Sequence, residues 1–198
     1  SVFFRVSCDK KVAVDPAYSF GWKENLKKYI ATLRCRKFYT TTSDEFFDRH
    51  ADEVFSKQKV DIVLVDGMHE FEFALRDIQN ALDHLSDNGV IVVHDCNPVS
   101  EAATCSFDEY EKRGFTGTWN GDVWKSIYYL LQNREDVDVF VADTDHGLGV
   151  ISKRKKRSVE RTHSCLKEIK AMTYESLEKN RIGFLNLKPV SSLQQLVT

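Results

Sequence analysis

The chain has no long apolar run and no strong excess of charge of either sign. None of its apolar stretches approaches the ~20 residues that a membrane-spanning helix needs, and the longest, residues 60–65 and 90–93, have strand length. The formal net charge is −2, so no overall field favours nucleic acid or a membrane surface. We therefore expect neither nucleic acid nor a membrane as a partner.

The cysteines show no pairing motif. All are widely scattered and none belongs to a Cys-x-x-Cys sequence: Cys8, Cys35, Cys96, Cys105 and Cys165. The first apolar stretch is too short for a signal peptide and is followed at once by Arg5. An odd, dispersed set of cysteines without a secretion signal indicates free thiols in a reducing compartment. We therefore predict a cytoplasmic location.

The apolar pattern alternates between strand and helix periods. Runs typical of buried strands occupy residues 11–15, 37–42, 60–66 and 90–95, and two further runs, 137–142 and 148–152, suit an antiparallel hairpin. Helical spacing occupies residues 22–33, 71–85, 107–112, 122–132, 159–170 and 174–184, and a further helix starts at Ser43. This alternation predicts an α/β fold with a mainly parallel sheet, an antiparallel last strand and a C-terminal helical extension.

The chain is long enough for one domain with a substantial core. We place that domain at residues 1–153 and the helical extension at residues 154–198. The basic run at residues 154–157 marks the boundary. It is either a solvated surface or a contact for phosphate, such as that of a nucleotide-sugar.

Three of the predicted strands end in an acid: Asp15, Asp66 and Asp95. Acids are poor strand residues, and the carboxyl ends of parallel strands form the edge at which α/β sheets bind ligands. Each acid alone could cap a turn or helix. Their repetition favours a functional site at one rim.

The stretch "VDIVLVDGMHEFEFALRDIQNALDHLSDNGVIVVHDCNP", residues 60–98, resembles class I S-adenosylmethionine-dependent methyltransferases. It is most similar to a group with an Asp-Gly-x-His sequence, a helix and a strand ending in His-Asp. The stretches "KVAVDP", "NGDVWK", "DHGLGVISK" and "TYESLEKNRIGFLNL" are also similar to that group. The resemblance covers roughly residues 9–187 and implies a Rossmann-like fold with S-adenosylmethionine as cofactor.

The glycine-rich loop that this family places after its first strand has no counterpart here. The first glycine is Gly21, which follows the predicted strand at residues 11–15. A parallel crossover needs about a dozen residues or more, and only residues 1–10 precede that strand. We therefore expect the first strand and its loop upstream of Ser1, and a gap or a foreign strand beside residues 11–15.

The resemblance also implies roles for particular residues. For the cofactor, it implies that Asp15 binds the ribose hydroxyls, that Ser43 and Asp44 lie at the adenine edge, and that Asp66 lines the pocket. Ser43 and Asp44 could equally form a plain helix N-cap.

Paired carboxylates at neighbouring strand ends suit a hard divalent cation. Asp66 and Asp95 are therefore the expected Mg²⁺ ligands, as in metal-dependent sugar O-methyltransferases. Asn97 is the nearest candidate for a third oxygen ligand. His94 is a softer alternative, better suited to zinc or iron.

The chemistry then needs a base to take a proton from the acceptor hydroxyl. His69 and His146 are the candidates, because a histidine pKa lies near neutrality. A lone histidine is more often structural, but His69 stands three residues after Asp66. The loop at residues 99–121 is interpreted either as a lid that excludes water or as a plain surface loop.

The leading hypothesis is an O-methyltransferase that acts on a sugar, nucleotide-sugar or other polyhydroxylated small molecule with Mg²⁺. The alternative is a non-catalytic or partner-completed domain that does not bind the cofactor alone. A third interpretation, another nucleotide-using Rossmann enzyme, is disfavoured by the same missing glycine sequence. If the gap exposes apolar strand flanks, a homo-oligomer is expected.

Overall fold

The computed structural model of the chain describes residues 6–18, 36–154 and 164–196. The chain divides into two compact units, residues 1–57 and 58–198, and each is described here by itself. The predicted helix at residues 22–33 and the start of the one at 159–170 lie outside the described residues. No helix in the described ranges is both long enough and apolar enough to cross a membrane.

The first unit contains a pair of parallel strands. β1 (Lys11–Val14) pairs with β2 (Arg36–Tyr39), and α2 (Ser43–Arg49) and α3 (Ala51–Phe55) follow. The buried Phe46 of α2 packs edge-on against Tyr39, with ring centroids 4.9 Å apart.

The N-cap of α2 is Thr42, whose hydroxyl accepts a hydrogen bond from the backbone N–H of Glu45. The alternative interpretation of Ser43 and Asp44, as the N-cap of this helix, is therefore wrong. Both lie within the first turn, because the threonine before them satisfies the free N–H.

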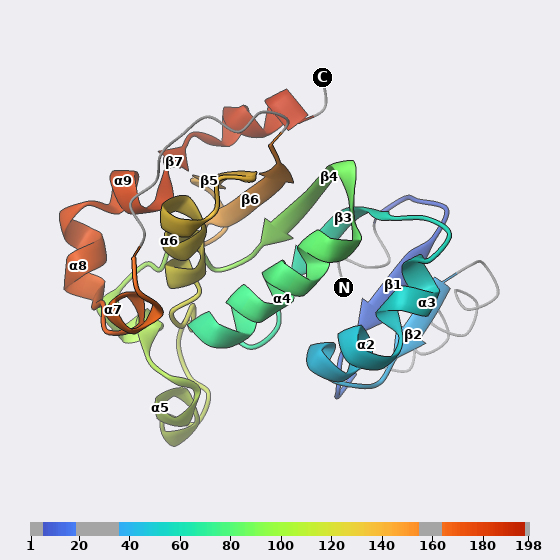
Figure 1. Cartoon of the computed structure of the whole chain (residues 1–198). Coiled ribbons are helices and arrows are strands. Elements are labelled where there is room, and N and C mark those ends of the chain that lie inside the picture. The colour runs from blue at the N-terminus through green and yellow to red at the C-terminus, as the bar shows by residue number, and fades with distance from the viewer. Residues whose placement is uncertain (1–5, 19–35, 155–163, 197–198) are drawn as a thin grey trace. The chain divides into compact units, whose positions relative to one another are not determined.

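The second unit is built on a five-stranded sheet of order β3-β4-β6-β5-β7 (Figure 1). Its strands are β3 (Val60–Val65), β4 (Leu85–Val93), β5 (Val137–Ala142), β6 (Leu148–Lys153) and β7 (Leu187–Lys188). β3 pairs parallel with β4 and β5 pairs parallel with β7, whereas β6 is antiparallel to both of its neighbours. The predicted α/β class, with a mainly parallel sheet and an antiparallel strand in the hairpin, is confirmed.

Two amphipathic helices pack on this sheet (Figure 1). α4 (Phe71–His84) follows β3 and α6 (Trp124–Asn133) precedes β5. Their apolar faces are buried with the central strands: Phe71, Leu75, Ile78, Trp124, Ile127, Leu130, Ile91 and Ile151. The apolar residues that recur with helical spacing in each segment therefore form the face of the helix that packs on the sheet.

The C-terminal extension belongs to the same core. It contains α7 (Leu166–Lys170), α8 (Tyr174–Lys179), α9 (Arg181–Leu185) and the 3-10 helix η3 (Val190–Leu196). α7 and α9 pack against α6 and bury Ile169 and Leu185. The single helix predicted at residues 174–184 is wrong, because Asn180 leaves the helical conformation and its side chain caps α9 through the N–H of Gly183.

The described parallel strands belong to one sheet in each unit, and the single sheet predicted to contain all of them stays a prediction. Within the described residues, β1 pairs only with β2, and β3 pairs only with β4. Ile62 and Leu64 of β3 are 68% and 47% exposed, whereas Val65 is 9% exposed. A gap or a foreign strand beside β1 was predicted, and this stays a prediction.

Candidate active site at the ends of β3 and β4

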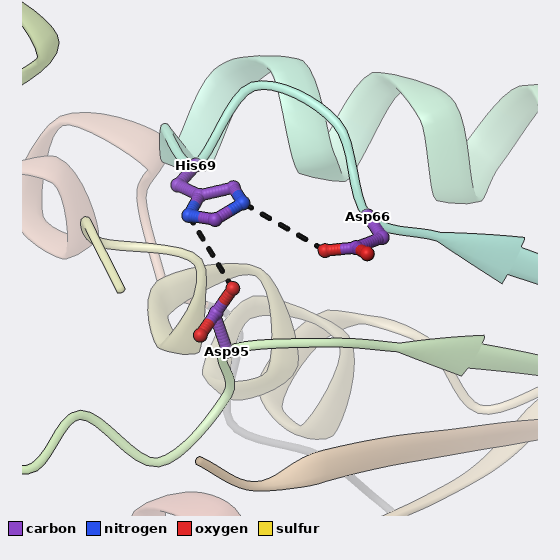
Figure 2. A group of neighbouring side chains, drawn as sticks. All are labelled: Asp66, His69 and Asp95. Atoms are coloured by element: carbon purple, nitrogen blue, oxygen red, sulfur yellow. Dashed lines mark ion pairs between the residues drawn. The ribbon is translucent and has the colours of Figure 1, made fainter. Parts of the chain in front are cut away.

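The site begins where two neighbouring parallel strands end. Asp66 comes directly after β3, and His94 and Asp95 come directly after β4. Because both strands run the same way, their carboxyl ends meet at one edge of the sheet. One ligand atom from each of Asp66, His69 and Asp95 lies within 4.8 Å of the others (Figure 2). The structure thus brings together the two acids that the sequence singled out.

His69 lies between the two carboxylates (Figure 2). Its Nε2 is 3.8 Å from Asp66 Oδ1 and its Nδ1 is 3.3 Å from Asp95 Oδ2. Nδ1 is also 2.9 Å from the carbonyl oxygen of Trp119, whose ring stacks on the imidazole at 4.7 Å. A carbonyl only accepts, so Nδ1 carries the hydrogen, and Nε2 is the basic nitrogen of the neutral ring.

Asp95 is held in an uncommon backbone conformation. Its φ is +62°, in the left-handed region that aspartate and asparagine adopt more readily than most residues. Its Oδ1 accepts a 2.5 Å hydrogen bond from Nδ2 of Asn120. Its Oδ2 lies 2.9 Å from Nδ1 of His94. One oxygen is therefore bound to Asn120 and the other faces the cluster.

The cluster is electrostatically arranged to favour positive charge. When Nε2 of His69 is also protonated, its hydrogen bond to Asp66 lowers the pKa of that carboxylate and keeps it ionised. Burial by itself would lower the pKa of His69, but Asp66, the Trp119 carbonyl and Asp95 raise it overall. His94 shows the same balance, since Asp95 and Asp66 outweigh burial and raise its pKa. Two carboxylates that stabilise positive charge in this way have the donor chemistry of a hard divalent cation.

Asn97, the predicted third metal ligand, has other partners. Its Nδ2 donates to Asp143 at 3.1 Å, and its Oδ1 accepts a 2.5 Å hydrogen bond from the Arg181 guanidinium. Arg181 also donates to the carbonyl of Pro98. An amide oxygen has a second lone pair, which could still bind a cation, and the role of Asn97 stays a prediction.

His146 lies in the exposed turn between β5 and β6. Its ring centroid is 6.4 Å from that of His94, and the neighbouring Asp145 places Oδ2 3.4 Å from His94 Nε2. This turn therefore reaches the cluster through His94. The role of His146 as a base stays a prediction.

The predicted cofactor residues Asp15, Ser43 and Asp44 belong to the first unit. Asp15 follows β1, and its Oδ1 accepts a 2.7 Å hydrogen bond from the backbone N–H of Ala17. Ser43 and Asp44 lie in the first turn of α2. The roles of all three, and that of Asp66, in holding the methyl donor stay predictions.

The sequence indicated that Trp119 and Asp122 flank the site, but not the contacts that the loop after β4 makes there. This loop contains the 3-10 helix η2 (Glu101–Thr104) and α5 (Phe107–Lys112) and ends in residues 119–122. Besides the contacts of Trp119 and Asn120, Asp122 accepts a hydrogen bond from the first N–H of α4 and donates its own N–H to the carbonyl of His69. The feature of the sequence that indicates a turn at this place is the Asn-Gly dipeptide within "NGDVWK", which is typical of a tight turn.

A cavity of about 440 Å³ also lies in the second unit. Its lining includes Glu70, Asp122, Lys125 and Lys170. Lys125 pairs with Asp122 and Lys170 pairs with Glu72, so both cations are neutralised. None of the three cluster residues lines this cavity, and we assign it no part in the chemistry.

Residues 5–96 match the model of a family described as a methyltransferase domain. The match supports a methyltransferase. It extends from before β1 to just past Asp95, and the methyl donor expected for such a domain is S-adenosylmethionine. No curated protein matches the chain.

The chain is also similar to a solved structure, the MycE methyltransferase from the mycinamycin biosynthetic pathway in complex with Mg, SAH and mycinamycin VI. The two are 16% identical, with a TM-score of 0.40. The similarity covers 87% of this chain and 50% of the MycE chain. The chain therefore spans about half the length of that protein.

Proposed function

We propose that this chain contributes the acceptor-side chemistry of an S-adenosylmethionine-dependent O-methyltransferase. Its substrate would be a hydroxyl of a sugar, nucleotide-sugar or other polyhydroxylated small molecule, with Mg²⁺ assistance. The observation that carries the proposal is the cluster of Asp66, His69 and Asp95 beyond β3 and β4. This cluster lies within the segment that matches the methyltransferase domain.

Asp66 and Asp95 would hold the cation. Both follow strands of the rigid sheet, and Asp95 turns one carboxylate oxygen toward the cluster. Asn97 would supply the third oxygen through the lone pair of Oδ1 that the hydrogen bond from Arg181 leaves available. When bound, Mg²⁺ supplies a positive charge that lowers the pKa of an acceptor hydroxyl.

His69 would act as the general base through Nε2. The acceptor oxygen forms a bond to the methyl carbon as the bond from that carbon to sulfur breaks, and the hydroxyl proton has to leave. The hydrogen bond from Nδ1 to Trp119 keeps the Nε2 lone pair available for that proton. His146, in the β5–β6 turn, is the second candidate for this role.

The remaining assignments follow from the same proposal. Asp15, Ser43, Asp44 and Asp66 would contact the methyl donor. The described cysteines, Cys8, Cys96, Cys105 and Cys165, are all free thiols, in keeping with a cytoplasmic protein. The exposed apolar side chains Ile62 and Leu64 of β3 would favour a homo-oligomer.

Calorimetric titration with MgCl₂ tests the metal site. Asp95→Asn keeps the side-chain shape and tolerates the left-handed backbone, so it should fold but bind Mg²⁺ about 100-fold more weakly or worse. Asp87→Asn removes an exposed acid of β4 and should bind as the unaltered chain does. Equal Mg²⁺ affinity in the unaltered chain and both variants would show that Asp95 does not bind the cation and would overturn the proposed metal site.

Activity is measured as S-adenosylhomocysteine formation with a panel of hexoses and nucleotide-sugars. Full methyl transfer in the presence of EDTA would remove the metal from the proposal. His69→Ala should lower turnover by roughly 10²–10⁴-fold while cofactor affinity is unchanged. Loss of cofactor affinity with unchanged turnover would move His69 to the cofactor pocket and leave His146 as the base.

The alternative function is a non-catalytic or partner-completed domain. The first glycine of this chain is Gly21, which follows β1, and this favours the alternative because the methyl-donor loop of such a fold needs glycine where the backbone approaches the ligand. Calorimetric titration of the chain with S-adenosylhomocysteine separates the two proposals. Binding supports the enzyme, and absence of binding supports the alternative.

A further inference from the structure

Asn120 is a fully buried polar side chain next to the cluster. Its Nδ2 donates to Asp95 Oδ1 at 2.5 Å, and its Oδ1 accepts from the backbone N–H of Val99 at 3.4 Å. A carboxylate only accepts and a backbone N–H only donates, so both neighbours require the same orientation of the amide. The side-chain amide of Asn120 therefore cannot flip without losing both hydrogen bonds, and its nitrogen donates to Asp95.

The backbone on either side of Asn120 is fixed. The N–H groups of Asn120 and Gly121 both donate to the carbonyl of Ala103, at 2.8 and 2.9 Å. The N–H of Asp122 donates to the carbonyl of His69 at 3.1 Å. Residues 119–122 thus join η2 to the turn between β3 and α4, and Asn120 cannot follow Asp95 if that side chain rotates.

A fixed donor on one oxygen determines where the other oxygen points. Asp95 is buried, and a carboxylate in that environment is costly unless its oxygens are hydrogen-bonded. With Oδ1 bound to Asn120, Oδ2 is directed at Nδ1 of His94 and of His69, at 2.9 and 3.3 Å. Rotation about the side chain would break a short charge-assisted hydrogen bond, which is among the stronger kinds in proteins.

We propose that Asn120 is the positioning residue of this site: it holds Asp95 so that Oδ2 alone faces the cluster, and it thereby sets the affinity of the site for a divalent cation. The cation itself rests on the proposed function, whereas the orientation of Asp95 does not. Partners of this kind, which contact a ligand residue and not the metal, typically change metal affinity by about 10–100-fold when they are removed.

The first experiment measures Mn²⁺ binding by electron paramagnetic resonance. Asn120→Leu keeps a similar volume and removes the donor, so the dissociation constant should rise about 10–100-fold. The matched control is Asn133→Leu, because the amide of Asn133 also donates and accepts: its Nδ2 donates to the carbonyl of Tyr129 and its Oδ1 accepts from the N–H of Ser164. The control should bind Mn²⁺ as the unaltered chain does, with both variants folded by circular dichroism. Unchanged affinity in a folded Asn120→Leu would overturn the proposal.

The second experiment needs neither metal nor a destabilising variant. In ¹H–¹⁵N spectra of the metal-free chain, the side-chain amide of Asn120 should exchange slowly with solvent, with one proton shifted downfield. Asp95→Asn should move that resonance. An Asn120 amide that exchanges freely, or ignores Asp95→Asn, overturns the proposal. A protected and responsive amide in a chain that does not bind Mn²⁺ supports the positioning role and sinks the metal site.

Discussion

Gly121→Ala tests how tightly residues 119–122 are fixed against the β3–α4 turn. Gly121 has φ +59°, and a Cβ added to it would lie 1.6 Å from the carbonyl oxygen of His69 and 2.7 Å from its carbonyl carbon. The left-handed conformation costs a non-glycine residue about 1–2 kcal/mol. Overpacking against a backbone that must shift costs typically about 1–3 kcal/mol more. The free energy of unfolding should therefore fall by about 2–5 kcal/mol.

Gly114→Ala separates the two contributions. Gly114 has φ +67°, and nothing lies within 4 Å of an added Cβ. It should therefore lose only the conformational part, about 1–2 kcal/mol. The free energy of unfolding of both variants is measured by urea unfolding, followed by tryptophan fluorescence and circular dichroism. Mn²⁺ affinity should fall only in Gly121→Ala, because only that substitution displaces His69. Equal stability losses in the two variants would refute the tight contact.

Two further predictions concern side chains away from the cluster. Burial raises the pKa of the Cys96 thiol, so iodoacetamide at pH 8 should alkylate the exposed Cys165 and reach Cys96 only after urea is added, as peptide mass spectrometry would show. Equal labelling of the two in the folded chain would contradict the burial. Hydrogen bonds from the backbone N–H and the hydroxyl of Ser106 lower the pKa of Glu109 below 4.5. The stability that these bonds give to α5 is therefore complete above pH 4.5 and is lost as the pH falls through the lowered pKa. Cα chemical shifts should show α5 losing helicity as the pH falls through the lowered pKa of Glu109, and Ser106→Ala should lower the helicity at neutral pH. Shifts that respond to neither change would count against the cap.

The local elements followed from residue periodicity. The apolar run before Asp66 corresponds to β3, because a short, nearly continuous apolar run is typical of a strand in a parallel sheet. The helical spacing from Phe71 corresponds to α4, because the buried face of a helix repeats with the period of its backbone. α5 was predicted with the bounds that it has. The sequence did not predict the break between α8 and α9 at Asn180. The side chain of this one residue caps the next helix, and a single capping side chain does not change the helical spacing of the apolar residues around it.

The placement of Asp66 and Asp95 at one edge also followed from the sequence. Two buried runs separated by an amphipathic helix predict adjacent parallel strands, and the residue after each strand must then lie at the same edge. The absence of a glycine-rich stretch before residue 11 led to the prediction of a gap or a foreign strand beside β1, which stays a prediction.

The partners of these acids were decided only by the tertiary structure. Asn120 is 25 residues from Asp95, Trp119 is 50 residues from His69, and Arg181 is 84 residues from Asn97. Such contacts have no period in the sequence, since they depend on the path that the loop after β4 takes back across the sheet edge. The sequence by itself determined which strands carry carboxylates and where those strands end. The fold decided which oxygen of Asp95 faces the cluster and which nitrogen of His69 is basic, because these depend on hydrogen bonds from a loop that joins the site only when the chain is folded.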